Sequence, residues 1–307
     1  MIKISVWKIF FEGLKIYCRN IHKFLGYMAF PVLGQLLGLV LVFGLTFLYT
    51  VNLPGLISGY KIFNSLATIV LCVVFIVLPG MLVWAKAFLD YLVTYGALNS
   101  MTQGALTTGK VYDFKAHNQT VTRKIFSFIG LWFLFGIFTF LSAIPFFWVP
   151  GLILFVYFVL IFQVFIFEEK VSPIGCFIKS FQLIKGRFAK TFGLMLILFI
   201  FTYWLLPAGV SVLFEAFSLM GILTAGFTSW VDVLPIDALY LLFQRINIII
   251  SPVDIAGFMS NNVIAFIVIG LTLPLRSICW SLWYKNLAEP VQENKKRKNN
   301  DVSVQEL

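Results

Sequence analysis

The sequence predicts an all-α fold, a polytopic transmembrane bundle of about six spans with amphipathic helices on its inner face. Hydrophobic residues make up 60% of the 307-residue chain and charged residues only 12%, which is far from the composition of a soluble domain. Uncharged runs of membrane-spanning length recur along the chain. Basic segments beside several of these runs carry apolar residues at helical spacing, a pattern typical of helices that lie on a membrane surface.

Residues 1–23 are predicted to form the first of these interfacial helices, on the cytoplasmic side. Lys8, Lys15 and Arg19 recur on one side at helical spacing, while Ile9 and Phe10 fall on the other. Because basic residues are spread through the segment, it does not resemble a cleavable signal peptide.

Residues 24–290 are predicted to form the transmembrane domain. Gly34 and Gly38 form a small-xxx-small pair in its first span, which favours close approach by a neighbouring helix. A short loop at Pro54, a polar connection over 91–124, and a turn between Pro145 and Pro150 are expected between spans. The expected spans are 24–49, 63–84, 125–147, 149–167, 188–206 and 263–284.

The stretch 207–262 is predicted to contain interfacial or re-entrant helices on the outer side. Its two apolar pieces are short for a span, and they carry the charged residues Glu215 and Arg245. The polar segment 291–307 is predicted to be a disordered cytoplasmic tail.

Another interfacial helix is predicted directly after the fourth span. Ser172 has the character of an N-cap and Pro173 that of a first helical residue, while Gly186 is a typical helix end. An apolar stripe at i, i+3, i+4 and i+7 spacing predicts an amphipathic helix on the membrane surface. Four basic residues of this region are candidate contacts for anionic lipids: Lys179, Lys185, Arg187 and Lys190.

The distribution of positive charge predicts the orientation. With six spans and a cytoplasmic N-terminus, every lysine and arginine except Lys61 and Arg245 falls on the inner side. This asymmetry predicts a multi-pass protein of the cytoplasmic membrane with both termini inside.

Three charged residues near the inner ends of spans form a candidate cluster. Arg276 lies before the inner end of the sixth span, Glu168 ends the fourth, and Asp90 follows the second. Charges within a membrane are costly and usually paired, so we expect Arg276 to pair with Glu168 or Asp90. The alternative is that Arg276 snorkels to the lipid headgroups.

The chain shows no catalytic, cofactor-binding or metal-binding motif. Its four cysteines are scattered without metal-ligand spacing, and no nucleophile elbow, phosphate-binding loop or zinc-protease motif is present. The net charge of +10 belongs to segments beside apolar runs, which indicates lipid headgroups rather than nucleic acid as the partner. We therefore expect a protein that is not an enzyme and needs no cofactor.

Two stretches resemble a known bacterial family, the membrane domain of glycerophosphodiester phosphodiesterases and its six-span relatives of unknown function. They are IFEEKVSPIGCFIKSFQLIKGRF, with its acidic, Ser-Pro and Lys-Gly pattern, and LTLPLRSICWSLWYKNL, with its Pro and Tyr-x-x-Leu pattern. The resemblance implies a membrane module. It does not carry over an activity, because the catalytic barrel that some members possess has no counterpart in this sequence.

Two functions from different classes are compatible with these patterns. The first is a non-catalytic module of the inner membrane that binds anionic inner-leaflet lipids or scaffolds an unidentified membrane protein partner. The second is a permease for a small or lipid-like solute, which requires polar residues around a cavity within the bilayer. Polar residues within the spans are sparse, although Gln35 and Gln163 are present.

Overall fold

The computed structural model describes residues 5–60, 65–108, 111, 114–168, 171–232 and 251–288. Within these residues the chain is helical and contains no strand. Six helical stretches are long and apolar enough to cross a membrane, which confirms an all-α, multi-pass membrane protein. They are Ile21–Tyr49, Leu66–Leu106, Ile125–Ser142, Pro145–Phe167, Phe188–Ala216 and Pro252–Ala288.

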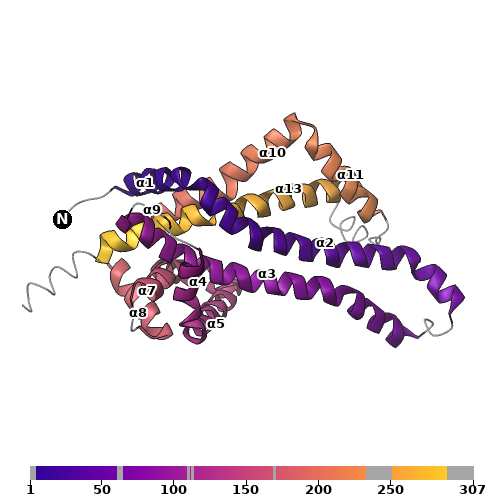
Figure 1. Ribbon diagram of the computed structural model, residues 1–307, viewed down its shortest axis with the longest axis horizontal. Helices are drawn as coiled ribbons and strands as arrows, with labels where there is room; N and C mark the ends of the chain where they lie inside the picture. The colour runs from indigo at the N-terminus through magenta and orange to yellow at the C-terminus, as the bar shows by residue number, and fades with distance from the viewer. Residues whose placement is uncertain are drawn as a thin grey trace, which may run out of the picture. The chain divides into compact units, whose positions relative to one another are not determined.

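The chain divides into two compact units (Figure 1). The first comprises the described parts of 1–27, 92–200 and 272–307, and the second those of 28–91 and 201–271. The helices that lie wholly in the first unit are α1 (Val6–Arg19), α4 (Phe114–Thr122), α5 (Ile125–Ser142), the 3-10 helix η2 (Pro145–Phe147), α6 (Trp148–Phe158), α7 (Ile161–Phe167), α8 (Pro173–Ile184), α9 (Phe188–Phe199) and the helix over residues 273–288.

The second unit contains most of α2 (Ile21–Gly59) and the first part of α3 (Leu66–Thr108). It also contains α10 (Leu206–Ala216), α11 (Leu219–Val231) and α13 (Pro252–Leu271). A π-helix over Ile200–Leu205 precedes α10.

Glycines allow α2 and α3 to pack closely within the second unit (Figure 1). A Cβ added to Gly34 would lie 2.9 Å from Ala87 Cβ, and one added to Gly38 would lie 2.6 Å from backbone atoms of Trp84. Gly38 follows Gly34 in α2, whereas its partner Trp84 precedes Ala87 in α3. The two helices are therefore antiparallel. The close approach predicted from the Gly34 and Gly38 pair is confirmed.

Several predicted boundaries differ from the structure. The loop expected at Pro54 is wrong, because α2 continues through this proline to Gly59. The polar connection expected from residue 91 is wrong over 91–108, which belongs to α3. Helix α13 begins at Pro252, well before the predicted residue 263.

The described part of the stretch 207–262 forms α10, α11 and the first part of α13, with a turn at residues 217–218 between α10 and α11. Two sequence predictions concern residues outside the described part of the chain. They are the tail over 291–307 and the second apolar piece of the outer segment, within 233–250.

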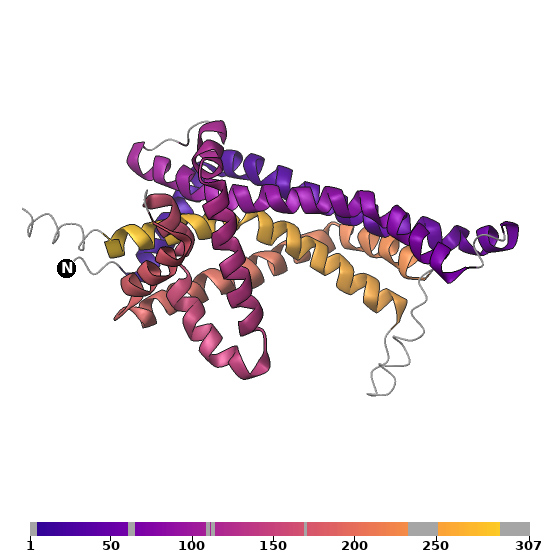
Figure 2. The ribbon, with the colours of Figure 1, turned by 90° about the horizontal axis from the view of Figure 1, so that it is seen from below.

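The hairpin of α5 and α6 places its turn at η2, and α8 packs against the half of the hairpin remote from that turn (Figure 2). Aromatic side chains make this junction. The rings of Tyr157 and Phe181 lie 4.5 Å apart between centroids, and those of Phe158 and Phe177 lie 5.0 Å apart. The turn at Pro145 forms the 3-10 helix, whereas Pro150, also expected at the turn, lies inside α6.

Candidate functional site

Helix α8 has the ends that its sequence predicts. The Ser172 hydroxyl accepts a hydrogen bond of 3.1 Å from the Gly175 amide, and Pro173 is the first helical residue. Gly186 follows the helix with φ +79°, a left-handed conformation that glycine adopts without a steric cost. Both predictions are confirmed, and together they fix where the basic residues around 185–190 lie relative to α8.

The two faces of α8 have different surroundings. Cys176, Ser180 and Ile184 are buried within the first unit, whereas Ile174 is 64% exposed and Ile178 is 56% exposed. Large apolar residues exposed along one face of a helix are typical of helices that contact a membrane surface or another protein.

The four candidate lipid contacts lie in two different settings. Lys179 forms an ion pair with Glu168. Lys185 and Lys190 are exposed, and Arg187 is partly exposed, around the joint between α8 and α9. The last three therefore present positive charge at the C-terminal end of α8.

Glu168 is the centre of a polar cluster that joins three helices. Its carboxylate contacts Lys179 from α8 and accepts a hydrogen bond of 2.8 Å from the Tyr284 hydroxyl. Its main-chain oxygen accepts a hydrogen bond of 3.5 Å from Lys124 Nζ, which also lies 5.7 Å from the centroid of the Phe165 ring. The cluster connects α8 and the start of α5 to the helix over 273–288.

The structure gives two members of the predicted charge cluster other partners. Asp90 forms an exposed ion pair of 2.8 Å with Lys86 one helical turn away, and Glu168 contacts Lys179. Arg276 is 8% exposed, so it lies within the protein and does not extend over a lipid-facing surface. Pairing of Arg276 with Glu168 or Asp90 stays a prediction.

The Cys176 thiol lies next to this cluster on the buried face of α8. Burial raises its pKa from 9.0 to about 11, and the negative charge of Glu168 acts in the same direction. Since the thiolate is the reactive form of cysteine, this side chain is inert at neutral pH.

A buried hydrogen-bond network joins three spanning stretches in the first unit. Asn99 Oδ1 on α3 accepts hydrogen bonds from Ser277 Oγ at 2.7 Å and from Gln163 Nε2 at 3.2 Å. All three residues are fully buried. Gln163 Oε1 is buried too and accepts no hydrogen bond from the described residues. A buried amide oxygen without a donor costs free energy. The network could therefore fix helix packing, or accept a hydrogen bond from a ligand at Gln163 Oε1.

A second polar contact ties α8 to the break between α6 and α7. The Ser180 hydroxyl donates a hydrogen bond of 2.7 Å to the Tyr157 carbonyl and accepts one of 3.3 Å from the Leu160 amide. The Tyr157 carbonyl and the Leu160 amide lie at the turn of residues 159–160, where the helix is interrupted. The serine therefore satisfies backbone groups that the interruption leaves without helical partners.

Gln163 was recognised in the sequence as a polar residue within a span, whereas Asn99 and Ser277 were not. Asn99 fell in a segment interpreted as a polar connection. Ala97, Leu98 and Met101 continue a helical spacing there, and this periodicity was the available signal. Ser277 lies one residue after Arg276 and carries no comparable signal.

The described site residues form buried hydrogen bonds, an ion pair between Lys179 and Glu168, and exposed basic and apolar side chains. Among the described residues, no group of three or more His, Cys, Asp or Glu side chains could hold a metal ion. Comparisons with protein-family models, curated proteins and solved structures found no match to this chain.

Proposed function

We propose that the chain is a non-catalytic integral membrane module that binds anionic lipids of the inner leaflet of a bacterial cytoplasmic membrane. The observation that carries the proposal is the position of α8. Ile174 and Ile178 are exposed on α8, and the joint at the C-terminal end of this helix carries the basic residues Lys185, Arg187 and Lys190. Apolar side chains inserted among lipid chains and cations at headgroup level are the two components of interfacial binding.

Helix α1 supports the same interpretation. It buries Ile9 and Phe10 and packs against α9, while Trp7 and Phe11 are exposed together with its basic residues Lys8, Lys15 and Arg19. Two helices of one unit thus combine exposed aromatic or aliphatic side chains with positive charge. The proposal extends the resemblance to the membrane domain of glycerophosphodiester phosphodiesterases, which implies a membrane module without a catalytic barrel.

The first test removes the positive charge of the joint. In the full-length protein in mixed micelles, K185Q/R187Q/K190Q should weaken binding of phosphatidylglycerol, measured by native mass spectrometry. Each basic residue near an anionic surface contributes about 1 kcal/mol, so the triple variant should lose about 3 kcal/mol, or roughly 100-fold in affinity. Phosphatidylcholine binding should not change.

The matched control keeps the charge at the same positions. K185R/R187K/K190R should retain the preference for phosphatidylglycerol and its decrease with salt. If the triple glutamine variant binds both lipids as the unmodified protein does, the joint is not the lipid contact.

The native cysteines test the proposed cytoplasmic location of α1. Cys18 is exposed and Cys176 is buried, with a pKa raised to about 11. A membrane-impermeant maleimide at neutral pH should label Cys18 only after the cells are permeabilised, and Cys176 in neither case. Mass spectrometry of labelled peptides checks both sites. Labelling of Cys18 on intact cells would reverse the proposed orientation.

A permease is the second candidate, and the network of Asn99, Gln163 and Ser277 favours it. Polar side chains from three spanning stretches meet beside an interrupted helix, as they do at transporter sites. Transport of a small solute by proteoliposomes, abolished by Asn99→Leu, would favour this alternative.

A further inference from the structure

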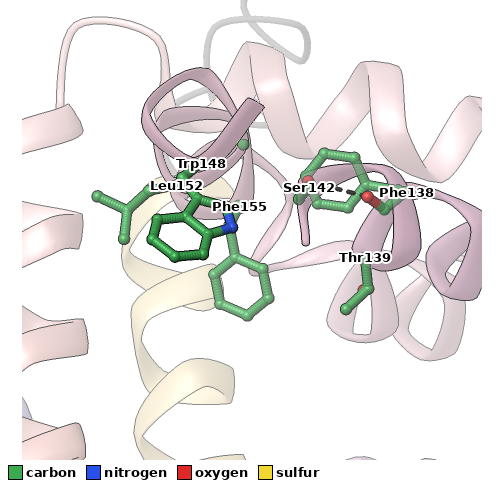
Figure 3. Close-up of a pocket in the computed structure, with 7 residues that line it drawn as sticks. Phe138, Thr139, Ser142, Trp148, Leu152 and Phe155 are labelled. Atoms are coloured by element: carbon green, nitrogen blue, oxygen red, sulfur yellow. Dashed lines mark hydrogen bonds between the residues drawn. The ribbon is translucent and has the colours of Figure 1, made fainter. Parts of the chain in front are cut away.

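An open groove lies between α5 and α6 near the turn of their hairpin (Figure 3). Its volume is ≈ 390 Å³, within the range of about 300–1,000 Å³ that is usual for ligand sites. Phe138, Thr139 and Ser142 contribute from α5, and Trp148, Leu152 and Phe155 contribute from α6. None of these side chains carries a charge.

The groove depends on a glycine where the two helices meet. Gly151 also lines it, and a Cβ added there would lie 2.7 Å from the Cβ and Oγ atoms of Ser142. The backbones can approach at this point only because the glycine has no side chain. The larger side chains of the groove are placed around this contact.

The hydrogen-bond donors that line the groove are already used by the hairpin itself. Thr139 Oγ1 donates to the Phe135 carbonyl and Ser142 Oγ to the Phe138 carbonyl, both at 2.8 Å. The indole Nε1 of Trp148 donates to the Ala143 carbonyl at 2.8 Å. The groove therefore offers no spare donor to a headgroup or a polar solute, and its chemistry suits a hydrocarbon.

The surroundings of the groove determine which hydrocarbon can reach it. Both of its walls belong to spanning stretches, Ile125–Ser142 and Pro145–Phe167, and Leu152 is 54% exposed. An open apolar groove in such a stretch faces the lipid chains. A second helix is a less suitable occupant, because a helix with its side chains is about 10–12 Å across.

We propose that this groove binds one acyl chain of a membrane lipid, from the leaflet opposite to the one that α8 faces. The turn of the hairpin lies at its end remote from α8, which assigns the leaflet. The proposal rests on the membrane location of the hairpin. It does not depend on the charge-based lipid binding proposed above, because the groove has no charged lining residue.

The test uses full-length protein in vesicles that contain a phospholipid with a photoreactive diazirine in its acyl chain. Cross-links mapped by mass spectrometry should be several-fold more frequent at Phe138, Leu152 and Phe155 than at Leu141, which is 49% exposed on the same hairpin but lies outside the groove. Phosphatidylcholine and phosphatidylglycerol probes with the same chain should give the same pattern.

A matched pair of variants controls for exposure and for size. Leu152→Trp places a large aromatic ring in the groove and should lower cross-linking at Phe138 and Phe155 several-fold. Leu141→Trp makes the same change at a similarly exposed position and should leave the pattern unaltered. Cross-linking that follows exposure alone would overturn the proposal.

The outcome is independent of the charge test. If the triple glutamine variant loses its preference for phosphatidylglycerol and lipid cross-linking at the groove does not change, both sites are supported. If the preference is unchanged and cross-linking at the groove persists, only the function assigned to the cationic joint is refuted.

Discussion

Replacing Gly38 by alanine should destabilise the protein, whereas the same replacement at Gly44 should not. A Cβ at Gly38 would lie 2.6 Å from N and Cα of Trp84, so α2 and α3 would have to separate. Overpacking of this kind costs about 1–3 kcal/mol, and a clash with backbone lies at the upper end because backbone cannot rotate away. The measurement is reversible unfolding in mixed micelles with increasing sodium dodecyl sulfate.

Gly44 is the matched control, because it lies in the same helix and nothing is within 4 Å of an added Cβ. Alanine is favoured over glycine by about 1 kcal/mol in a helix interior, so Gly44→Ala should be neutral or stabilising. Equal effects of the two alanines would mean that α2 and α3 do not make this contact in the membrane.

Asn99→Leu should produce the second large loss of stability. It removes the oxygen that accepts hydrogen bonds from Ser277 and Gln163, and leaves two buried donors without an acceptor. Each such donor costs about 1–3 kcal/mol, although hydrogen bonds between membrane helices average only about 0.6 kcal/mol. Because both donors are fully buried, we expect the unfolding free energy to fall by about 2–4 kcal/mol in the same micelle assay.

The control for Asn99 is Asn262→Leu. The Asn262 amide is exposed and donates to the Phe258 carbonyl one turn away in α13, so its loss should change the unfolding free energy little. If the two leucine variants have the same stability, the Asn99 network does not hold the three spanning stretches together.

The sequence predicted those features that short-range physics controls. The six spans follow from hydropathy, and the ends of α8 follow from Ser172 and Gly186. The contact between α2 and α3 follows from Gly34 and Gly38. The hydropathy of a span and the caps of a helix depend on residues close together in the sequence. A glycine allows close helix packing because it has no side chain.

The predictions that were wrong concern residues whose interpretation depends on distant partners. Asn99 and its neighbours resembled a polar loop. Asn99 accepts hydrogen bonds from Gln163, which is 64 positions away in the sequence, and from Ser277, which is 178 positions away. No local pattern shows that such side chains face a protein interior. Pro54 was expected to lie in a loop after the first span, yet α2 continues through it to Gly59.

The start of α13 was available in the sequence but was misinterpreted. Ser251 and Asp254 form a reciprocal capping pair at the start of this helix. The Ser251 amide donates to Asp254 Oδ2 at 2.8 Å, and the Asp254 amide donates to Ser251 Oγ at 3.2 Å. Serine followed three residues later by an acid is a helix-start pattern, and it precedes Pro252 at the first helical position.

The bond between Ser180 and the interruption at residues 159–160 has a consequence for engineering the protein. Excising α8, or exchanging it for the surface helix of another protein, would strip the Tyr157 carbonyl and the Leu160 amide of their partner. An unsatisfied peptide group in hydrocarbon costs several kcal/mol. Chimeras that treat this helix as an interchangeable module should therefore insert poorly unless they retain a hydroxyl side chain at the position of Ser180.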